Sequence, residues 1–250
     1  MAREQATRRA EEAAVVTGAS AGIGEAVATA LLERGLTVVT LQRSAPKFSH
    51  PNLHFRAVDL ADPAATREVS QQVAAEFPVR YLVNNAGANR PALLEQATID
   101  DLQHVTSITL GASMLLMQAF VPGMRRARFG RIVSISLRAI MGKSSRTVYA
   151  SAKAGLIGMT NTVAIEVGGD GITVNVVVPG PVATELFDNG HPLGSVKRQT
   201  VIDGVLVGRV GTPDDIARAV LFFLERDAGF ITGQALFVCG GTSVTGTGGA

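Results

Sequence analysis

Tyr149 and Lys153 are the two residues whose types and spacing most directly suggest chemistry. A separation of four residues places both side chains on one face of a helix. A phenol with an ordinary pKa of ~10 exchanges protons poorly at neutral pH, but a neighbouring ammonium group favours the phenolate and lowers that pKa. The spacing therefore predicts an acid–base pair, although Tyr and Lys also occur four residues apart without any such role.

A glycine-rich turn near the N-terminus suggests where a phosphate-bearing ligand could bind. The sequence TGASAGIG contains Gly18, Gly22 and Gly24 and precedes a helical stretch from Glu25 to Glu33. Glycines permit a tight turn and a close approach of the backbone, and the first N–H groups of a helix attract a pyrophosphate. The alternative is an ordinary strand-to-helix turn, because such a motif alone is weak evidence.

Three motifs follow one another along the chain. They are TGxxxGxG at 17–24, NNAG at 84–87 and YxxxK at 149–153. In this order and spacing they resemble the short-chain dehydrogenase/reductase (SDR) family, and the similarity extends over 13–241. Their joint occurrence is far more specific than any one of them.

Two later motifs narrow the resemblance to one branch. PGPVAT at 179–184 and ITGQ at 231–234 make the chain most similar to the 3-oxoacyl-[acyl-carrier-protein] reductases. The resemblance implies a Rossmann-like fold and hydride transfer between a nicotinamide cofactor and a ketone or secondary alcohol, for which no metal is required. It leaves the substrate open, because one fold hosts many activities.

The resemblance also assigns roles to residues. Tyr149 is expected to protonate the carbonyl oxygen, while Lys153 lowers the phenol pKa and holds the nicotinamide ribose. Ser136 is expected to polarise the carbonyl, which completes the catalytic set. Asp59 is the expected adenine contact. The residues expected to bind the cofactor are Gly18, Ser20, Gly22, Ile23, Gly24, Arg43, Asp59, Leu60, Asn85, Ala86, Gly87, Tyr149, Lys153, Pro179, Gly180, Val182 and Thr184.

The choice between NADP(H) and NAD(H) depends on the end of the second strand. An acidic residue there would bind a ribose diol and repel a 2′-phosphate, but this chain has Gln42 and Arg43. Arginine pairs with phosphate and stacks on adenine, so NADP(H) is favoured over NAD(H). Ala21 argues against this choice, because many relatives that prefer NADP carry a basic residue there.

The carbonyl-polarising serine lies where the sequence departs from the family. Counting back from Tyr149 by the family spacing leads to Ser136, whereas counting forward from GRIV leads to Leu137. The two counts imply a one-residue deletion, and adjacent strand residues point to opposite faces. We favour Ser136 because leucine donates no hydrogen bond. Ser144 and Ser145 are weaker substitutes from the following loop.

Thr109 is a second departure, because the family pattern has asparagine at this position of the preceding long helix. In relatives that asparagine anchors a water linked to the lysine. A threonine hydroxyl offers fewer hydrogen-bonding groups, and the alternative is a packed helix residue without a role in proton transfer.

Basic residues gather in two places. One cluster ends the long helix and could dock an acidic carrier protein or simply favour the helix C-terminus. The other lies in the loop before Tyr149 and could meet an acidic substrate. The first cluster is Arg125, Arg126, Arg128 and Arg131, and the second is Arg138, Lys143 and Arg146.

Short β-branched runs alternate with stretches of helical period, which is typical of βαβ units and a parallel sheet. Seven runs suit a single doubly wound Rossmann-like α/β domain with helices on both faces, and the family strand order would be 3-2-1-4-5-6-7. The expected strands are Ala13–Thr17, Thr37–Gln42, Leu53–Val58, Val79–Asn84, Arg131–Ser136, Ile172–Val178 and Ala235–Val238.

Two further segments position the chemistry. Apolar residues at three- and four-residue spacings predict an amphipathic helix over Thr147–Val167, which would carry the acid–base pair. The segment 181–205 follows a strand end and is rich in turn residues, so we expect a substrate lid. His191 in this lid is a weak candidate for contact with substrate.

Composition limits the class of protein. The chain has 250 residues, 46% of them hydrophobic, which is enough for one sizeable core. A formal net charge of +2 gives no reason to expect nucleic acid or an anionic membrane as a partner. The single cysteine, Cys239, cannot form an intramolecular disulfide or a multi-cysteine metal site.

The expected organisation is a charged mobile tail, 1–12, followed by one domain, 13–250. The tail has no apolar run, which favours the cytoplasm, and the resemblance implies a homotetramer. Expected partners are a small carbonyl or alcohol substrate and an acyl carrier protein. Two alternatives stay open: a cofactor-binding regulator without useful turnover, and an NAD-linked alcohol dehydrogenase.

Overall fold

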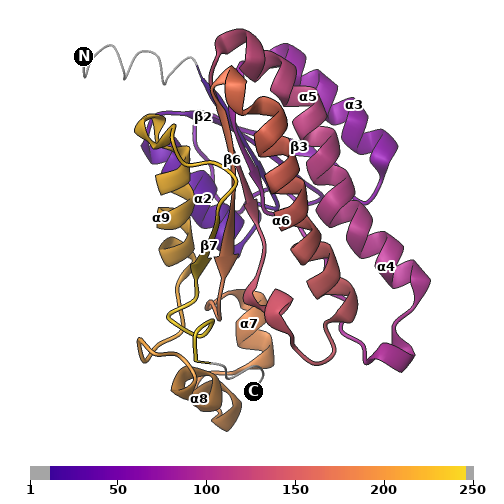
Figure 1. Ribbon diagram of the computed structural model, residues 1–250, viewed down its shortest axis with the longest axis vertical. Coiled ribbons are helices and arrows are strands. Elements are labelled where there is room, and N and C mark those ends of the chain that lie inside the picture. The colour runs from indigo at the N-terminus through magenta and orange to yellow at the C-terminus, as the bar shows by residue number, and fades with distance from the viewer. Residues whose placement is uncertain (1–11, 246–250) are drawn as a thin grey trace.

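Seven strands pair in parallel into one sheet, in the order β3-β2-β1-β4-β5-β6-β7 (Figure 1). This is the order that the family resemblance implies. The computed structural model describes residues 12–245. The strands are β1 Ala13–Thr17, β2 Thr37–Gln42, β3 Leu53–Ala57, β4 Val79–Asn84, β5 Gly130–Ile135, β6 Ile172–Pro179 and β7 Ala235–Val238.

Helices cover both faces of the sheet, so its central strands are apolar along their length. Ala13 and Val15 of β1 pack into one hydrophobic core and the alternate residues Ala14 and Val16 into the other. Figure 1 shows α2 and α9 on one side of the sheet and α3, α5 and α6 on the other. The helices are α2 Gly22–Glu33, α3 Pro63–Glu76, α4 Ile99–Thr106, α5 Ala112–Ala127, α6 Thr147–Val167, α7 Glu185–Gly190, α8 Val196–Asp203 and α9 Pro213–Leu224, with short 3₁₀ turns at η1 Leu94–Gln96, η3 Arg138–Met141, η4 Gly168–Asp170 and η5 Arg226–Ala228.

A π-helical segment, η2 Ser107–Gly111, joins α4 and α5 into one continuous helix. The combined helix, Ile99–Ala127, is long and apolar enough to cross a membrane by length and composition alone, with a mean hydropathy of 1.4 in its most apolar window. Half of that window is buried inside the protein.

The expected elements are confirmed with small shifts at their ends. β3 ends one residue earlier than expected, although the Val58 N–H still donates to the Gln42 carbonyl at 3.0 Å. β5 begins and ends one residue earlier, which places Ser136 just after the strand. The expected tail lies outside the described residues except for Glu12, and the expected lid consists of α7 and α8 with their connections.

Candidate active site

The motifs come together at one edge of the sheet. The glycine-rich turn follows β1, NNAG spans the end of β4, Ser136 follows β5, and PGPVAT spans the end of β6. Because these neighbouring strands are parallel, their carboxyl ends share one edge, where open α/β sheets bind ligands.

Thr17 and Asn85 hold the first two of these loops together. The Thr17 hydroxyl accepts hydrogen bonds from the main-chain N–H groups of Asn85 and Ala86, both at 2.9 Å. The Asn85 side-chain amide donates to the carbonyls of Thr17 and Gly18, both at 3.0 Å. Sequence reasoning assigned no role to Thr17, although it is the first residue of the TGxxxGxG motif.

The glycine-rich turn forms a cradle that larger residues would fill. Gly18 and Gly22 have positive φ angles of 68° and 63°, which L side chains rarely adopt. A Cβ at Gly24 would lie 2.2 Å from the Gly18 carbonyl oxygen, and one at Gly22 would lie 3.2 Å from the Thr184 methyl group. Ala21, the N-cap residue of α2, makes no side-chain hydrogen bond to the first N–H groups of the helix. Uncapped N–H groups beside a glycine cradle fit a dinucleotide pyrophosphate.

Tyr149 and Lys153 project from α6 beside the NNAG loop. The Lys153 side chain is buried, and its ammonium group donates to the Ile135 carbonyl at 2.6 Å. It lies 5.9 Å from the centroid of the Tyr149 ring. A Cβ at Gly87 would lie 3.2 Å from the Lys153 Nζ and 3.6 Å from Cε2 of Tyr149, so the glycine allows the loop to approach both residues.

Burial controls the protonation of this pair. Burial lowers the pKa of Lys153 from 10.5 to about 8 and raises the pKa of Tyr149 above its ordinary value of 10. The cation that lowers the pKa of Tyr149 is Arg146, although its effect is smaller than that of burial. The net shift of the Tyr149 pKa is thus upward, opposite to the lowering expected from Lys153, and sequence reasoning missed the effect of Arg146.

Ser136 lies against α6. Its main-chain N–H donates to the Val177 carbonyl at 2.9 Å, and its buried hydroxyl donates to the Lys153 carbonyl at 2.9 Å. Leu137 is only half-buried and precedes the 3₁₀ turn η3. The structure thus brings a hydroxyl to the backbone of the helix that carries the acid–base pair.

Comparison with known proteins agrees with this geometry. The family described as "Enoyl-(Acyl carrier protein) reductase" matches residues 18–243. The chain is 36% identical over 241 residues to "(2S)-[(R)-hydroxy(phenyl)methyl]succinyl-CoA dehydrogenase subunit BbsD" of Thauera aromatica, covering 92% of this chain and 96% of the relative. It is 38% identical over 236 residues to "3-oxoacyl-[acyl-carrier-protein] reductase FabG" of Escherichia coli, covering 91% and 96%.

A solved structure is also similar. It is a 3-oxoacyl (acyl-carrier-protein) reductase from Agrobacterium tumefaciens with NADP bound, at a TM-score of 0.82 and 28% identity over 92% of this chain and 93% of that chain. The chain belongs to the short-chain dehydrogenase/reductase family. This SDR is a nicotinamide-dependent oxidoreductase that interconverts ketones and secondary alcohols.

The residues expected to contact the adenine end of the cofactor follow β2 and β3. The buried Gln42 side chain accepts a hydrogen bond from the Ala19 N–H at 2.6 Å, so it braces the glycine-rich turn. Arg43, the next residue, is exposed. Asp59 is also exposed and accepts from the Ala61 N–H at 2.9 Å, which fixes the loop after β3. Leu60 beside it is buried.

The segment after β6 packs tightly against the end of β7. A Cβ at Gly180 would lie 2.6 Å from the Cys239 Cα, and the Gly180 N–H donates to the Val238 carbonyl at 3.0 Å. Thr184 caps α7 by accepting from the Phe187 N–H at 3.3 Å. The backbone of this expected nicotinamide-binding segment is therefore fixed at both ends.

The segment expected to form a lid has polar contacts of its own. Arg198 is buried, pairs with Asp188 at 2.6 Å, donates to the His191 carbonyl at 3.0 Å and lies 5.3 Å from the centroid of the Phe187 ring. The His191 ring stacks on Phe187 with 4.4 Å between ring centroids. His191 thus packs within the lid.

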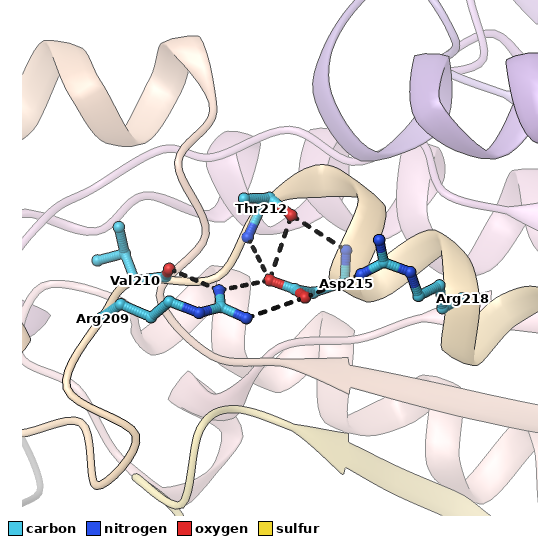
Figure 2. Close-up of polar contacts among 5 residues, drawn as sticks. All are labelled: Arg209, Val210, Thr212, Asp215 and Arg218. Carbon is cyan, nitrogen blue, oxygen red and sulfur yellow. Dashed lines mark hydrogen bonds and ion pairs between the residues drawn. The ribbon is translucent and has the colours of Figure 1, made fainter.

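A second cluster anchors the chain where it returns from the lid to α9 (Figure 2). Arg209 binds both carboxylate oxygens of Asp215, at 2.6 and 3.1 Å. Thr212 and Asp215 form a capping box at the start of α9. Arg209, followed by the Thr212 hydrogen bonds, holds the pKa of Asp215 well below its usual range.

Thr109 lies in the π-helical segment of this SDR. Its side chain is buried, and its hydroxyl has no hydrogen-bond partner among residues 12–245. Its carbonyl accepts a hydrogen bond from the Ser113 hydroxyl at 2.6 Å. π-helical segments occur frequently at functional sites. Within residues 12–245, however, no side-chain hydrogen bond joins Thr109 to Lys153.

The cluster expected to dock a carrier protein is largely engaged within the protein. Arg125 and Arg128 both pair with Asp170, at 2.8 and 3.1 Å. Arg131 is buried and donates to backbone carbonyls, including those of Glu225 and Arg226. These contacts favour a structural role for most of the cluster.

Proposed function

We propose that this SDR is an NADP(H)-preferring ketoreductase in which Tyr149 is the proton donor. The observation that carries the proposal is the shared packing of Tyr149 and Lys153 around Gly87, on the same sheet edge as the glycine cradle. That arrangement places a half-buried tyrosine and a buried ammonium group beside the loops that would hold a nicotinamide dinucleotide.

The proton chemistry follows from the side chains present. A nicotinamide bound at this edge would supply the hydride. Tyr149 donates its phenolic proton to the carbonyl oxygen, and Lys153 provides positive charge near the resulting phenolate. The hydrogen bond to Ile135 holds that ammonium in place. Ser136 is proposed to polarise the carbonyl, for which its hydroxyl would turn from the Lys153 carbonyl toward the substrate.

The preference for NADP(H) is proposed from Arg43. Its exposed guanidinium follows β2 directly, where a 2′-phosphate would be close to the adenine ribose. The Gln42 side chain is buried and accepts a hydrogen bond from the Ala19 N–H. The end of β2 therefore offers no carboxylate to bind a ribose diol. The similar structure from Agrobacterium tumefaciens contains NADP, which supports the same choice.

The proposed substrates are 3-oxoacyl compounds and similar small ketones. The relative from Escherichia coli is named for a carrier-bound 3-oxoacyl substrate, and the one from Thauera aromatica for an acyl-CoA. An acyl carrier protein is thus one proposed partner, although the ion pairs of Arg125 and Arg128 leave few free cations near the end of α5.

A homotetramer is proposed as the assembly. Phe222 of α9 and Leu236 and Phe237 of β7 are 37–50% exposed, and together they give this sheet edge apolar side chains to pack against another copy. Multi-angle light scattering on the purified protein tests this directly.

The function is tested with purified protein, NADPH and a panel of β-keto esters, diketones and cyclic ketones. We expect oxidation of NADPH with at least one ketone. NADPH binding without oxidation across the panel would support a non-catalytic cofactor-binding protein instead. Comparing kcat/KM for NADPH and NADH separates the proposed preference from an NAD-linked alcohol dehydrogenase.

A further inference from the structure

Three cations lie in the segment that connects Ser136 to the proposed catalytic pair on α6. Arg138 begins the 3₁₀ turn after Ser136, and Lys143 and Arg146 lie between that turn and Tyr149. None of these three loop cations forms an ion pair with a carboxylate within residues 12–245.

Many other arginines of the described chain do have such partners. The pairs include Arg34–Glu225, Arg56–Glu76, Arg90–Asp101, Arg198–Asp188 and Arg209–Asp215. Within residues 12–245 the protein therefore pairs several of its arginines with carboxylates, whereas the three loop cations have no carboxylate partner.

The loop cations are close enough to repel one another. The pKa of Lys143 is lowered first by loss of water around its ammonium group, and then by the charges of Arg146 and Arg138. The charge of Arg146 also reaches the Tyr149 phenol, whose pKa it lowers. An anion bound among the three would relieve this repulsion.

Arg146 connects the start of α6 with the loop that follows NNAG. It is the N-cap residue of α6, whose first turn has no acidic residue and no side-chain cap. A cation is unfavourable at this end of a helix because the helix dipole is positive there. Its guanidinium donates to the Asn89 side chain at 3.1 Å, in the loop that follows Gly87. Arg146 thus holds positive charge between the start of α6 and the loop that follows NNAG, close to Tyr149.

We propose that Arg138, Lys143 and Arg146 bind an anionic group of the substrate, a carboxylate or a phosphate, at a distance from the reacting carbonyl. Guanidinium groups bind both oxyanions through paired hydrogen bonds. This inference rests on the proposed ketoreductase function and specifies its substrate class. The preferred substrates are negatively charged ketones, which the loop cations attract and orient with the carbonyl toward Tyr149.

The test compares three versions of one 3-oxo ester, whose far end is a methyl ester, a free carboxylate or a phosphate monoester. At low ionic strength, we expect kcat/KM for at least one anionic version to exceed that for the neutral version by about 10-fold, and added salt to reduce the difference. The better of the two anions identifies the group. Equal kcat/KM values for all three would overturn the proposal.

Variants locate the effect. Arg138→Gln combined with Lys143→Gln should lower the ratio of anionic to neutral kcat/KM by about 5-fold or more. Neither side chain makes a hydrogen bond within residues 12–245, so the fold should tolerate both changes. Arg67→Gln, on the exposed surface of α3, is the matched control and should leave the ratio unchanged. A preference that survives the double substitution would also overturn the proposal.

Binding separates this inference from the proposed reaction. If none of the three esters is reduced, the proposed ketoreductase function fails for this substrate class. Isothermal titration calorimetry then measures the affinity of the protein for the same three esters and still tests the role of the loop cations. Tighter binding of an anionic ester, lost in the double variant, would support the anion site, and equal binding of all three would refute it.

Discussion

The Lys153 ammonium group donates a hydrogen bond to the Ile135 carbonyl at 2.6 Å. This contact ties α6 to the end of β5, which is the point where Ser136 follows the strand. A second contact, from the Ser136 hydroxyl to the Lys153 carbonyl at 2.9 Å, runs in the opposite direction. Together these two contacts hold the end of β5 against α6, so the position of Tyr149 on that helix depends on both.

Gly87→Ala should reduce activity more than stability. The added methyl group would lie 3.2 Å from the Lys153 Nζ and displace the pair or the NNAG loop by a fraction of an ångström. We expect kcat to fall by about 10-fold or more, because small misplacements of catalytic groups are costly. The control is Gly158→Ala on α6, where an added Cβ meets nothing within 4 Å. This control should leave kcat unchanged and stabilise the helix by ~1 kcal/mol. Unchanged kcat in Gly87→Ala would show that the close approach is unimportant.

Lys153 should make stability depend on alkaline pH. Burial lowers its folded-state pKa from 10.5 to about 8, so below pH 8 the folded protein carries the cost of a buried ammonium. Between about 8 and 10.5 the unfolded chain binds more protons at this site than the folded protein, so this cost is relieved as pH rises. The measurement is the free energy of unfolding against pH for the native protein and Lys153→Met. The difference between the two curves should shift in favour of the native protein across this range, and a constant difference would contradict the assigned pKa.

Arg43→Ala should weaken NADPH binding selectively. Loss of a charge-assisted hydrogen bond to phosphate corresponds to an increase in Kd of about 10-fold or more. Fluorescence titration with NADPH and NADH measures both constants, and Lys47→Ala, a nearby exposed cation, is the control. Equal losses of affinity for the two cofactors would remove the phosphate role from Arg43.

Asp215→Asn should destabilise the segment that anchors the lid. The change removes the carboxylate that binds Arg209 and Thr212, and comparable capping interactions contribute about 1 kcal/mol. Because the folded-state pKa of Asp215 is depressed, its contribution is present above its unfolded pKa and is lost as pH falls toward the folded value. Thermal unfolding at neutral pH should show a lower Tm for Asp215→Asn than for Asp214→Asn, its exposed neighbour. Equal Tm values for the two variants would contradict the anchoring role.

Much of the fold was accessible from local patterns in the sequence. The β-branched runs and the three- and four-residue spacing within Thr147–Val167 predicted the strands and α6 closely, because burial on both faces of a parallel sheet imposes those patterns. The strand ends were less certain. Ser136 continues the hydrogen bonding of β5 to Val177 without belonging to the strand, which is a matter of backbone geometry.

The electrostatics of the candidate site could not be predicted in the same way. The spacing of Tyr149 and Lys153 indicated that they lie on one helix face, but the raised pKa of the phenol depends on burial by other elements. The influence of Arg146 depends on the fold of the loop before α6, and the burial of Gln42 depends on its contact with the glycine-rich turn. The Gln42 contact joins two distant segments, and the effect of Arg146 depends on the conformation of its loop, so residue spacing alone predicts neither.

The most direct test of the proposed chemistry is Tyr149→Phe. The substitution removes only the phenolic hydroxyl and leaves the other expected cofactor contacts, so NADPH should still bind, as measured by fluorescence titration. With a ketone that the native protein reduces, kcat should fall by about 10²- to 10⁴-fold, the usual contribution of a general acid. A kcat equal to that of the native protein, with NADPH still bound, would contradict the assignment of Tyr149 as the proton donor.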